Sequence, residues 1–336
     1  MKNLLYIIAI SILIVSCNDN ADPDENGHEG VMAYILSEGQ FQNSNAEITG
    51  YDIGTGEEKP QFYQQVNESQ LGDVGHSMTT IGDELYIVVN NSHRLQVTDA
   101  NTLEQQASIE IDNEPSPRFI AGVSGDQALV TSLASTELAV IDTENHEQTG
   151  TIDIGTTSEE IAVDGDHALI RTDIFDSNEI ILFNWQDESV EQTLQFDGAP
   201  AGMKTDSDNR AWIWVSGEEA YFSIREVTTG DELNRFELPE PVTSVSFDEL
   251  GEQVFAATDS GILRMDKSTG AIDDELFVEQ ENLGSVGFDH TTRNHVFAGT
   301  EPDFETRDEV FVFDADGEIA DTIQAGYRPH QFHVTE

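Results

Sequence analysis

Basic residues and cysteine are both scarce in this chain, and each scarcity excludes a class of protein. Only 14 of the 336 residues are Lys or Arg, against 66 Asp and Glu, so the formal net charge is −52. A chain of this charge repels the phosphates of nucleic acids and anionic lipid surfaces, and we expect it to bind neither. The single cysteine, Cys17, excludes a framework of internal disulfides.

The acidic residues are dispersed along the chain, whereas an acidic interaction tail would concentrate them in one block. This composition, with dispersed acidic residues and little lysine, resembles that of proteins from salt-loving organisms, in which high ionic strength screens the repulsion between the charges. The charge therefore indicates a halophilic habitat and says nothing about the ligand.

No apolar run reaches the about 20 residues that a transmembrane helix needs. The run over residues 4–15 follows Lys2 and ends in Ile14-Val15-Ser16-Cys17, which resembles the lipobox of bacterial lipoproteins. We interpret residues 1–16 as a lipoprotein signal peptide, Cys17 as the lipidated residue and residues 17–30 as an acidic tether. The alternative is an ordinary secretory signal followed by a chance cysteine.

The acidic stretch after Cys17 also resembles the export tag of lipoproteins that reach the outer face of the outer membrane. We expect a lipid-anchored outer-membrane protein that faces the cell exterior and touches the membrane only through its lipid.

A short sequence motif of the form apolar-x-Asp, or its equivalent, recurs seven times in segments rich in strand-forming residues. Its copies are Gly50-Tyr51-Asp52, Val97-Thr98-Asp99, Val140-Ile141-Asp142, Leu182-Phe183-Asn184, Ile224-Arg225-Glu226, Arg264-Met265-Asp266 and Val312-Phe313-Asp314. The third residues of successive copies are 47, 43, 42, 42, 40 and 48 positions apart. Periods of roughly 40–50 residues with several short strands are typical of propeller blades. We predict an all-β fold, a seven-bladed β-propeller.

The second repeat shows the plan of one blade. Residues 77–82 alternate as an innermost strand, residues 85–89 form an apolar run suited to a strand buried on both faces, and residues 95–99 and 106–111 alternate again. Turns rich in Gly, Asp and Asn separate the strands. No stretch shows a sustained helical period.

The first repeat lacks one strand, and the C-terminal end of the chain supplies one strand that belongs to no other repeat. Residues 31–36 read as a second strand without a first, and residues 330–334 read as a lone strand with no blade after it. Pairing the C-terminal strand into the first blade closes the ring and removes two exposed sheet edges. We predict one propeller domain over residues 31–336.

Functional residues of a propeller gather on the face formed by the loops that lead into each blade and those that join its second and third strands. Two of the latter, 38–46 and 299–308, are unusually long and belong to adjacent predicted blades, and long ordered loops are more often functional than idle. We predict a ligand-binding face that comprises Phe41, Asn43, Asn90, Arg118, Phe175, Phe304 and His330.

Structural roles compete with this hypothesis. A phenylalanine on a polar loop is usually a loop anchor. The cations His76, Arg118, Arg328 and His330, which approach the predicted axis, are equally suited to neutralising carboxylates or to joining blades.

Catalytic patterns are missing from the sequence. It contains no Gly-x-Ser-x-Gly elbow, no His-Glu-x-x-His and no phosphate-binding glycine loop. His330 and His333 are three apart on a predicted strand, so they point to opposite faces and cannot chelate one metal. We expect no metal site, no covalent cofactor and no enzymatic activity.

Several sequence segments resemble those of a known protein family. Ile35-Leu36-Ser37-Glu38-Gly39-Gln40-Phe41, Leu85-Tyr86-Ile87-Val88-Val89-Asn90-Asn91-Ser92, and Ala325-Gly326-Tyr327-Arg328-Pro329-His330-Gln331-Phe332 resemble the surface-lipoprotein propellers of YncE type. The chain is most similar to the BtuG-like group of cobalamin-binding lipoproteins, which cap a TonB-dependent outer-membrane transporter. His76 departs from the glutamine expected there.

The resemblance implies a surface protein that captures a corrinoid, cobalamin or a relative, and passes it to a TonB-dependent transporter. Two other hypotheses stay open: a metal-dependent propeller lactonase or hydrolase with a carboxylate-and-asparagine site at the axis, and a protein-interaction scaffold without a small-molecule ligand.

Overall fold

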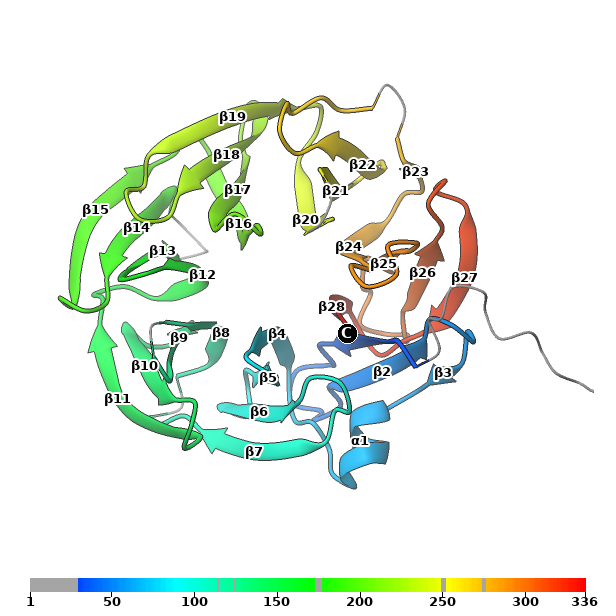
Figure 1. The fold of residues 1–336 in the computed structure, drawn as a ribbon, viewed down its shortest axis with the longest axis horizontal. Coiled ribbons are helices and arrows are strands. Elements are labelled where there is room, and N and C mark those ends of the chain that lie inside the picture. The colour runs from blue at the N-terminus through cyan, green and yellow to red at the C-terminus, as the bar shows by residue number, and fades with distance from the viewer. Residues whose placement is uncertain (1–29, 114, 124, 173–176, 249–251, 274–275) are drawn as a thin grey trace, which may run out of the picture.

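The strands of the chain form a closed ring of seven four-stranded sheets. This computed structural model describes residues 30–113, 115–123, 125–172, 177–248, 252–273 and 276–336. The proposed signal peptide, Cys17 and most of the tether lie outside these residues. Viewed down its short axis, the innermost strand of every sheet lies next to the central axis of the ring (Figure 1). The predicted all-β propeller with seven blades is confirmed.

Blade 1 is closed by the C-terminal strand. Its order is β28 (Pro329–Val334), β1 (Met32–Ser37), β2 (Glu47–Asp52) and β3 (Glu58–Lys59). Antiparallel pairing places Ala33 opposite Val334, and the Met32 amide donates to Thr335 Oγ1 at 2.8 Å. The predicted exchange of the last strand into the first blade is confirmed.

The other six blades follow in chain order, each running from the axis outward. Blade 2 contains β4 (Gly75–Ile81), β5 (Glu84–Val89), β6 (Arg94–Asp99) and β7 (Gln105–Glu110); blade 3 contains β8 (Pro117–Gly122), β9 (Gln127–Ser132), β10 (Glu137–Asp142) and β11 (Glu147–Asp153); blade 4 contains β12 (Ser158–Asp164), β13 (His167–Thr172), β14 (Glu179–Asn184) and β15 (Ser189–Gln195). Blade 5 contains β16 (Ala199–Thr205), β17 (Arg210–Ser216), β18 (Ala220–Glu226) and β19 (Glu232–Leu238); blade 6 contains β20 (Val242–Phe247), β21 (Gln253–Thr258), β22 (Gly261–Asp266) and β23 (Val278–Glu279); blade 7 contains β24 (Leu283–Phe288), β25 (Val296–Thr300), β26 (Glu309–Phe313) and β27 (Ile319–Gln324).

The hydrophobic core lies between neighbouring blades. Second strands such as β5 and β21 are buried along almost their whole length, because a sheet lies against each of their faces, whereas outer strands such as β15 are mostly exposed. One cluster, for example, joins Leu182 of blade 4 to Ile213 of blade 5. Because each blade buries its faces only against its neighbours, the ring must be closed for blades 1 and 7 to be covered.

One helix departs from the sequence prediction. Helix α1 (Phe62–Asn67) follows β3 and packs against blade 1, with Tyr63 fully buried. Gln61 and Glu68, which bracket it, both adopt left-handed backbone conformations. Six residues are too few to display a helical period, which explains why the pattern analysis missed it. No helix within the described residues is long and apolar enough to cross a membrane.

Candidate functional site

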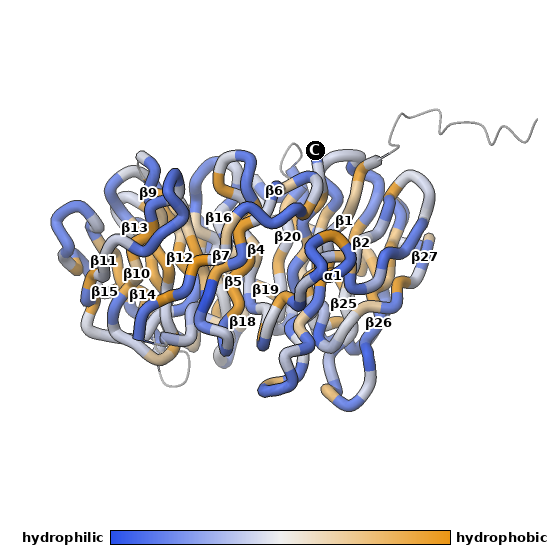
Figure 2. The backbone as a smooth tube through the Cα atoms, turned by 90° about the horizontal axis from the view of Figure 1, so that it is seen from below, coloured by the Kyte–Doolittle hydropathy of each residue, from blue (hydrophilic) through white to orange (hydrophobic). Residues whose placement is uncertain are grey.

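Two long loops project from one face of the ring, beneath strands β1–β2 and β25–β26 in Figure 2. They are residues 38–46 and 301–308, in blades 1 and 7, which are neighbours through the closure of the ring. The Gln40 side-chain amide donates to the Phe304 carbonyl oxygen at 2.7 Å and links the two loops. The sequence therefore predicted both loops and their adjacency, with the second loop beginning two residues later than expected.

Each projecting loop exposes a phenylalanine. The side chain of Phe41 is 64% exposed and that of Phe304 is 41% exposed. Phe304 adopts a left-handed conformation, and the adjacent turn is held by Asp303, which accepts hydrogen bonds from the amides of Glu305 and Thr306 at 2.8 and 2.9 Å. Asn43 donates to Gln40 Oε1 at 3.3 Å. Neither phenylalanine is a buried loop anchor, which was the alternative role.

On the same face, a repeated β-bulge surrounds the central axis of the ring, and the bulged residues define the axial mouth. In all seven blades the register between the innermost and the second strand shifts at the start of the innermost strand, which leaves extra residues without partners. Bulges re-aim side chains and increase the local twist. The bulged residues form an axial ring of His330, His76, Arg118 with Phe119, Glu159 with Glu160, Ala201, Thr243 and Gly284, in blade order.

One side of the axial ring carries ionisable groups that bond from blade to blade. Arg118 Nε donates to both carboxylate oxygens of Glu159, at 2.7 and 2.9 Å. Arg171 pairs with Glu160 and also donates to the Pro200 carbonyl oxygen at 3.4 Å. His330 Nε2 lies 2.7 Å from the His76 carbonyl oxygen. The other side of the ring, Ala201, Thr243 and Gly284, is small and uncharged, so the mouth is asymmetric.

Burial shifts the pKa values of this cluster in opposite directions. Burial lowers the pKa of His76 well below 6.5, and the neighbouring Arg118 guanidinium lowers it further. Burial also lowers the pKa of His330. The pKa of the Glu159 carboxyl is raised by burial, although Arg118 opposes the shift. His76 Nε2 lies 3.9 Å from Glu159 and is buried without a hydrogen-bond partner among the described residues, so this contact joins a neutral imidazole to a carboxyl group.

The remaining predicted site residues have varied surroundings. Asn90 is buried, and its side-chain amide donates to the Pro117 carbonyl oxygen at 2.9 Å, so it links blades 2 and 3. Arg328, which was expected near the axis but not in the ligand-binding face, pairs with Glu38 at the base of a projecting loop. Phe175 lies outside the described residues. The predicted group is thus split between the loop tips, with Phe41 and Phe304, and the axial ring, with Arg118 and His330.

Three ionisable residues of the mouth were missed in the sequence, namely Glu159, Glu160 and Arg171. In an acidic chain, two more glutamates carry no signal of their own. Aligning the innermost strands of the structure places Glu159 at the position of His76 and Arg118, because each of the three follows the first residue of its strand, β4, β8 or β12.

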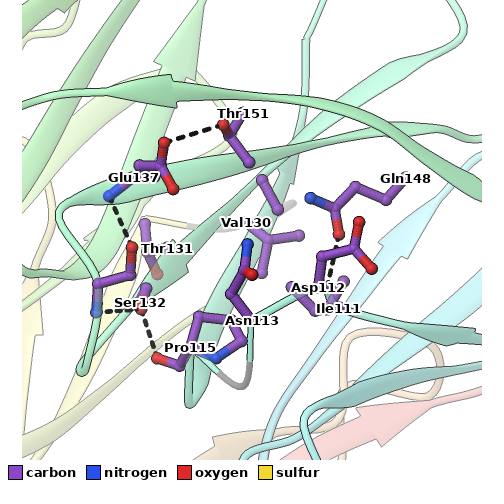
Figure 3. Close-up of a pocket in the computed structure, with 12 residues that line it drawn as sticks. Ile111, Asp112, Asn113, Pro115, Val130, Thr131, Ser132, Glu137, Gln148 and Thr151 are labelled. Carbon is purple, nitrogen blue, oxygen red and sulfur yellow. Dashed lines mark hydrogen bonds between the residues drawn. The ribbon is translucent and has the colours of Figure 1, made fainter.

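Two cavities lie away from the axis. One, of about 20 Å³, lies between blades 2 and 3, where Gln148 Oε1 accepts from the Asp112 amide and Glu137 accepts from Thr151 (Figure 3). It is water-sized. The other, of about 110 Å³, lies beside the loop 38–46. Within the part of the chain that the structure describes, no three His, Cys, Asp or Glu side chains are grouped to hold a metal ion.

Comparison with known proteins identifies the family and supports the fold. The crystal structure of a quinonprotein alcohol dehydrogenase-like protein from Bacteroides thetaiotaomicron superposes with a TM-score of 0.69 at 12% identity, over 91% of this chain and 78% of that one. At this identity the likeness concerns the fold alone. No curated protein matches the chain. The profile of a domain of unknown function, DUF5074, matches residues 31–272, and the chain therefore belongs to the DUF5074 family.

Proposed function

We propose that this protein is a cell-surface lipoprotein whose loop-bearing face captures a corrinoid without changing it chemically and passes it to a TonB-dependent outer-membrane transporter. The observation that carries the proposal is the pair of exposed phenylalanines, Phe41 and Phe304, on two hydrogen-bonded loops beside an asymmetric polar mouth. The pairing of the two loops through Gln40 and Phe304 matters because isolated exposed hydrophobic residues are common and need no ligand.

The chemistry of a corrinoid suits this face. Aromatic side chains cover the plane of a macrocycle, while amide and guanidinium groups bond its peripheral amides and its phosphate. Arg118 uses Nε for Glu159, and its two terminal nitrogens have no partner among the described residues. The first-blade segment that resembles the YncE-type propellers ends at Phe41, within the projecting loop. The polar rim and apolar tips together are typical of a site that binds a large amphipathic molecule.

Equilibrium binding of cyanocobalamin to the purified protein in molar salt tests the ligand. We expect saturable binding that Phe41→Ala and Phe304→Ala each weaken about tenfold, since an aromatic contact contributes about 0.5–1.5 kcal/mol beyond its buried area. Ile319→Ala is the matched control, because Ile319 is 54% exposed but lies on the outer strand β27. Absence of saturable binding in the micromolar range would contradict the corrinoid assignment.

The anchor has a separate test. Cys17→Ala should leave the propeller folded and release it from the membrane fraction, because the proposed lipid is its only attachment. A Cys17→Ala protein that still sediments with membranes after a high-salt wash would show that the chain is held there by something else.

A further inference from the structure

Most of the residues that line the cavity beside the loop 38–46 have uncharged side chains that can form hydrogen bonds. It lies between that loop and helix α1, which packs on the outer rim of the ring, away from the axial mouth (Figure 1). Its volume is about 110 Å³, whereas one water needs about 10–15 Å³ by the same measure. The lining residues are Asn43, Ser44, Asn45, Ala46, Glu47, Ile48, Gln61, Tyr63, Gln64, Gln70 and Leu71.

Side-chain amides dominate the lining. Gln61, Gln64 and Gln70 are exposed side chains that border the same space, and they form no side-chain hydrogen bond with any described residue. An amide offers both a carbonyl acceptor and an NH₂ donor. The wall therefore presents both types of group, which is what a ligand rich in hydroxyl groups requires, since each hydroxyl donates one bond and accepts others.

The cavity is electrically neutral in an otherwise strongly acidic protein. Glu47 is its one charged lining residue, and Arg307 binds both Glu47 oxygens, at 2.9 and 2.6 Å. The stretch 60–67 that supplies one wall contains no charged residue, although the chain carries 66 acidic ones. An anion would find no free cation among these lining residues and a cation no free carboxylate, so the lining favours a neutral polar ligand.

The wall formed by helix α1 is held in place before any ligand binds. The ring of Tyr63 is buried, and its hydroxyl donates to Gln105 Oε1 at 2.9 Å. Asn67 donates to the carbonyl oxygens of Tyr63 and Leu103, at 3.1 and 3.0 Å. The backbone that carries Gln64 is therefore ordered in advance, which reduces the conformational entropy lost on binding.

We propose that this cavity is a carbohydrate-binding site that holds one neutral sugar unit. The amides of Gln61, Gln64 and Gln70 bond its hydroxyl groups, and the buried residues Ile48 and Tyr63 lie behind them. The site shares Asn43 with the proposed corrinoid face, but its sugar-bonding glutamines come from residues 61–70, outside that face. It would attach the propeller to a neutral glycan at the cell surface, independently of any ligand at the axial mouth.

Saturation-transfer NMR on the full protein in molar salt tests the site. The probes are methyl α-D-glucopyranoside, methyl β-D-galactopyranoside, methyl α-D-mannopyranoside and N-acetyl-D-glucosamine. We expect at least one to bind saturably in the millimolar range. Gln64→Ala and Gln70→Ala should each weaken it about fivefold, the change that accompanies loss of one net hydrogen bond. Gln192→Ala, on the exposed outer strand β15, should leave binding unchanged.

The outcomes separate this site from the corrinoid face. Sugar binding that persists in the presence of cyanocobalamin, together with cyanocobalamin binding that Gln64→Ala leaves intact, supports the inference. Failure of all four sugars to bind the wild-type protein overturns it, as does binding that Gln64→Ala and Gln70→Ala do not alter. Competition between the sugar and cyanocobalamin would also overturn it, because the cavity would then belong to the corrinoid site.

Discussion

Breaking the Arg118–Glu159 pair at the axial mouth should destabilise the ring more than any surface charge substitution. Glu159 is 3% exposed and Arg118 15%, and Arg118 Nε donates to both carboxylate oxygens. Arg118→Met leaves the carboxyl group buried without its partner, and loss of one member of a buried pair costs about 3–5 kcal/mol. The unfolding entropy of roughly 300 residues is about 0.6 kcal/mol per kelvin, so Tm should fall by about 5–8 °C.

Urea and thermal unfolding in molar salt, followed by tryptophan fluorescence and circular dichroism, measure the loss. Arg264→Met is the charge-matched control: Arg264 pairs with Asp273 at 2.7 Å at the surface, and its loss should cost under about 1 kcal/mol. The double variant Arg118→Met with Glu159→Met should recover most of the stability, because it removes the buried charge as well. A double variant as unstable as Arg118→Met alone would refute the reasoning.

Three further predictions concern closure, charge and pH. Deleting residues 329–336 removes β28 from blade 1 and should abolish cooperative unfolding or cause aggregation; a truncated protein that melts like the full chain would contradict strand exchange. Tm should rise markedly from dilute buffer to about 1 M salt, where the Debye length is about 3 Å, and a salt-independent Tm would argue against the halophilic interpretation. Burial holds the pKa values of His76 and His330 below 6.5 in the folded protein. The unfolded chain therefore binds protons more readily than the folded one, and the free energy of unfolding should fall as the pH drops below about 6.5. His76→Gln should reduce that loss in melts at several pH values, and an unchanged pH profile would exclude His76 as a cause.

The candidate site was predictable in its position but not in its contacts. The length of the loops 38–46 and 299–308 is visible in the sequence, and their adjacency follows from closing the ring. Asn90 looked equally available, yet its amide is committed to the Pro117 carbonyl oxygen of the next blade. Whether a polar side chain is free or already bonded depends on the neighbouring blade, which a local pattern does not reveal.

The sequence by itself determined the number of blades and the exchange of the last strand. Both follow from local regularities: a repeat of 40–48 residues, alternation of apolar residues along strands, and an incomplete unit at each end. These signals are strong because every blade must bury two faces against its neighbours.

Only the tertiary structure decided the partners at the mouth and the rim. Arg118 meets Glu159 across 41 positions of sequence, and Gln40 meets Phe304 across 264. The β-bulge that turns the axial residues out of the ladder depends on the register of two strands, and the amide-lined cavity depends on a helix of only six residues. Such features arise where separate segments pack together, and packing between distant segments has no period that a sequence could display.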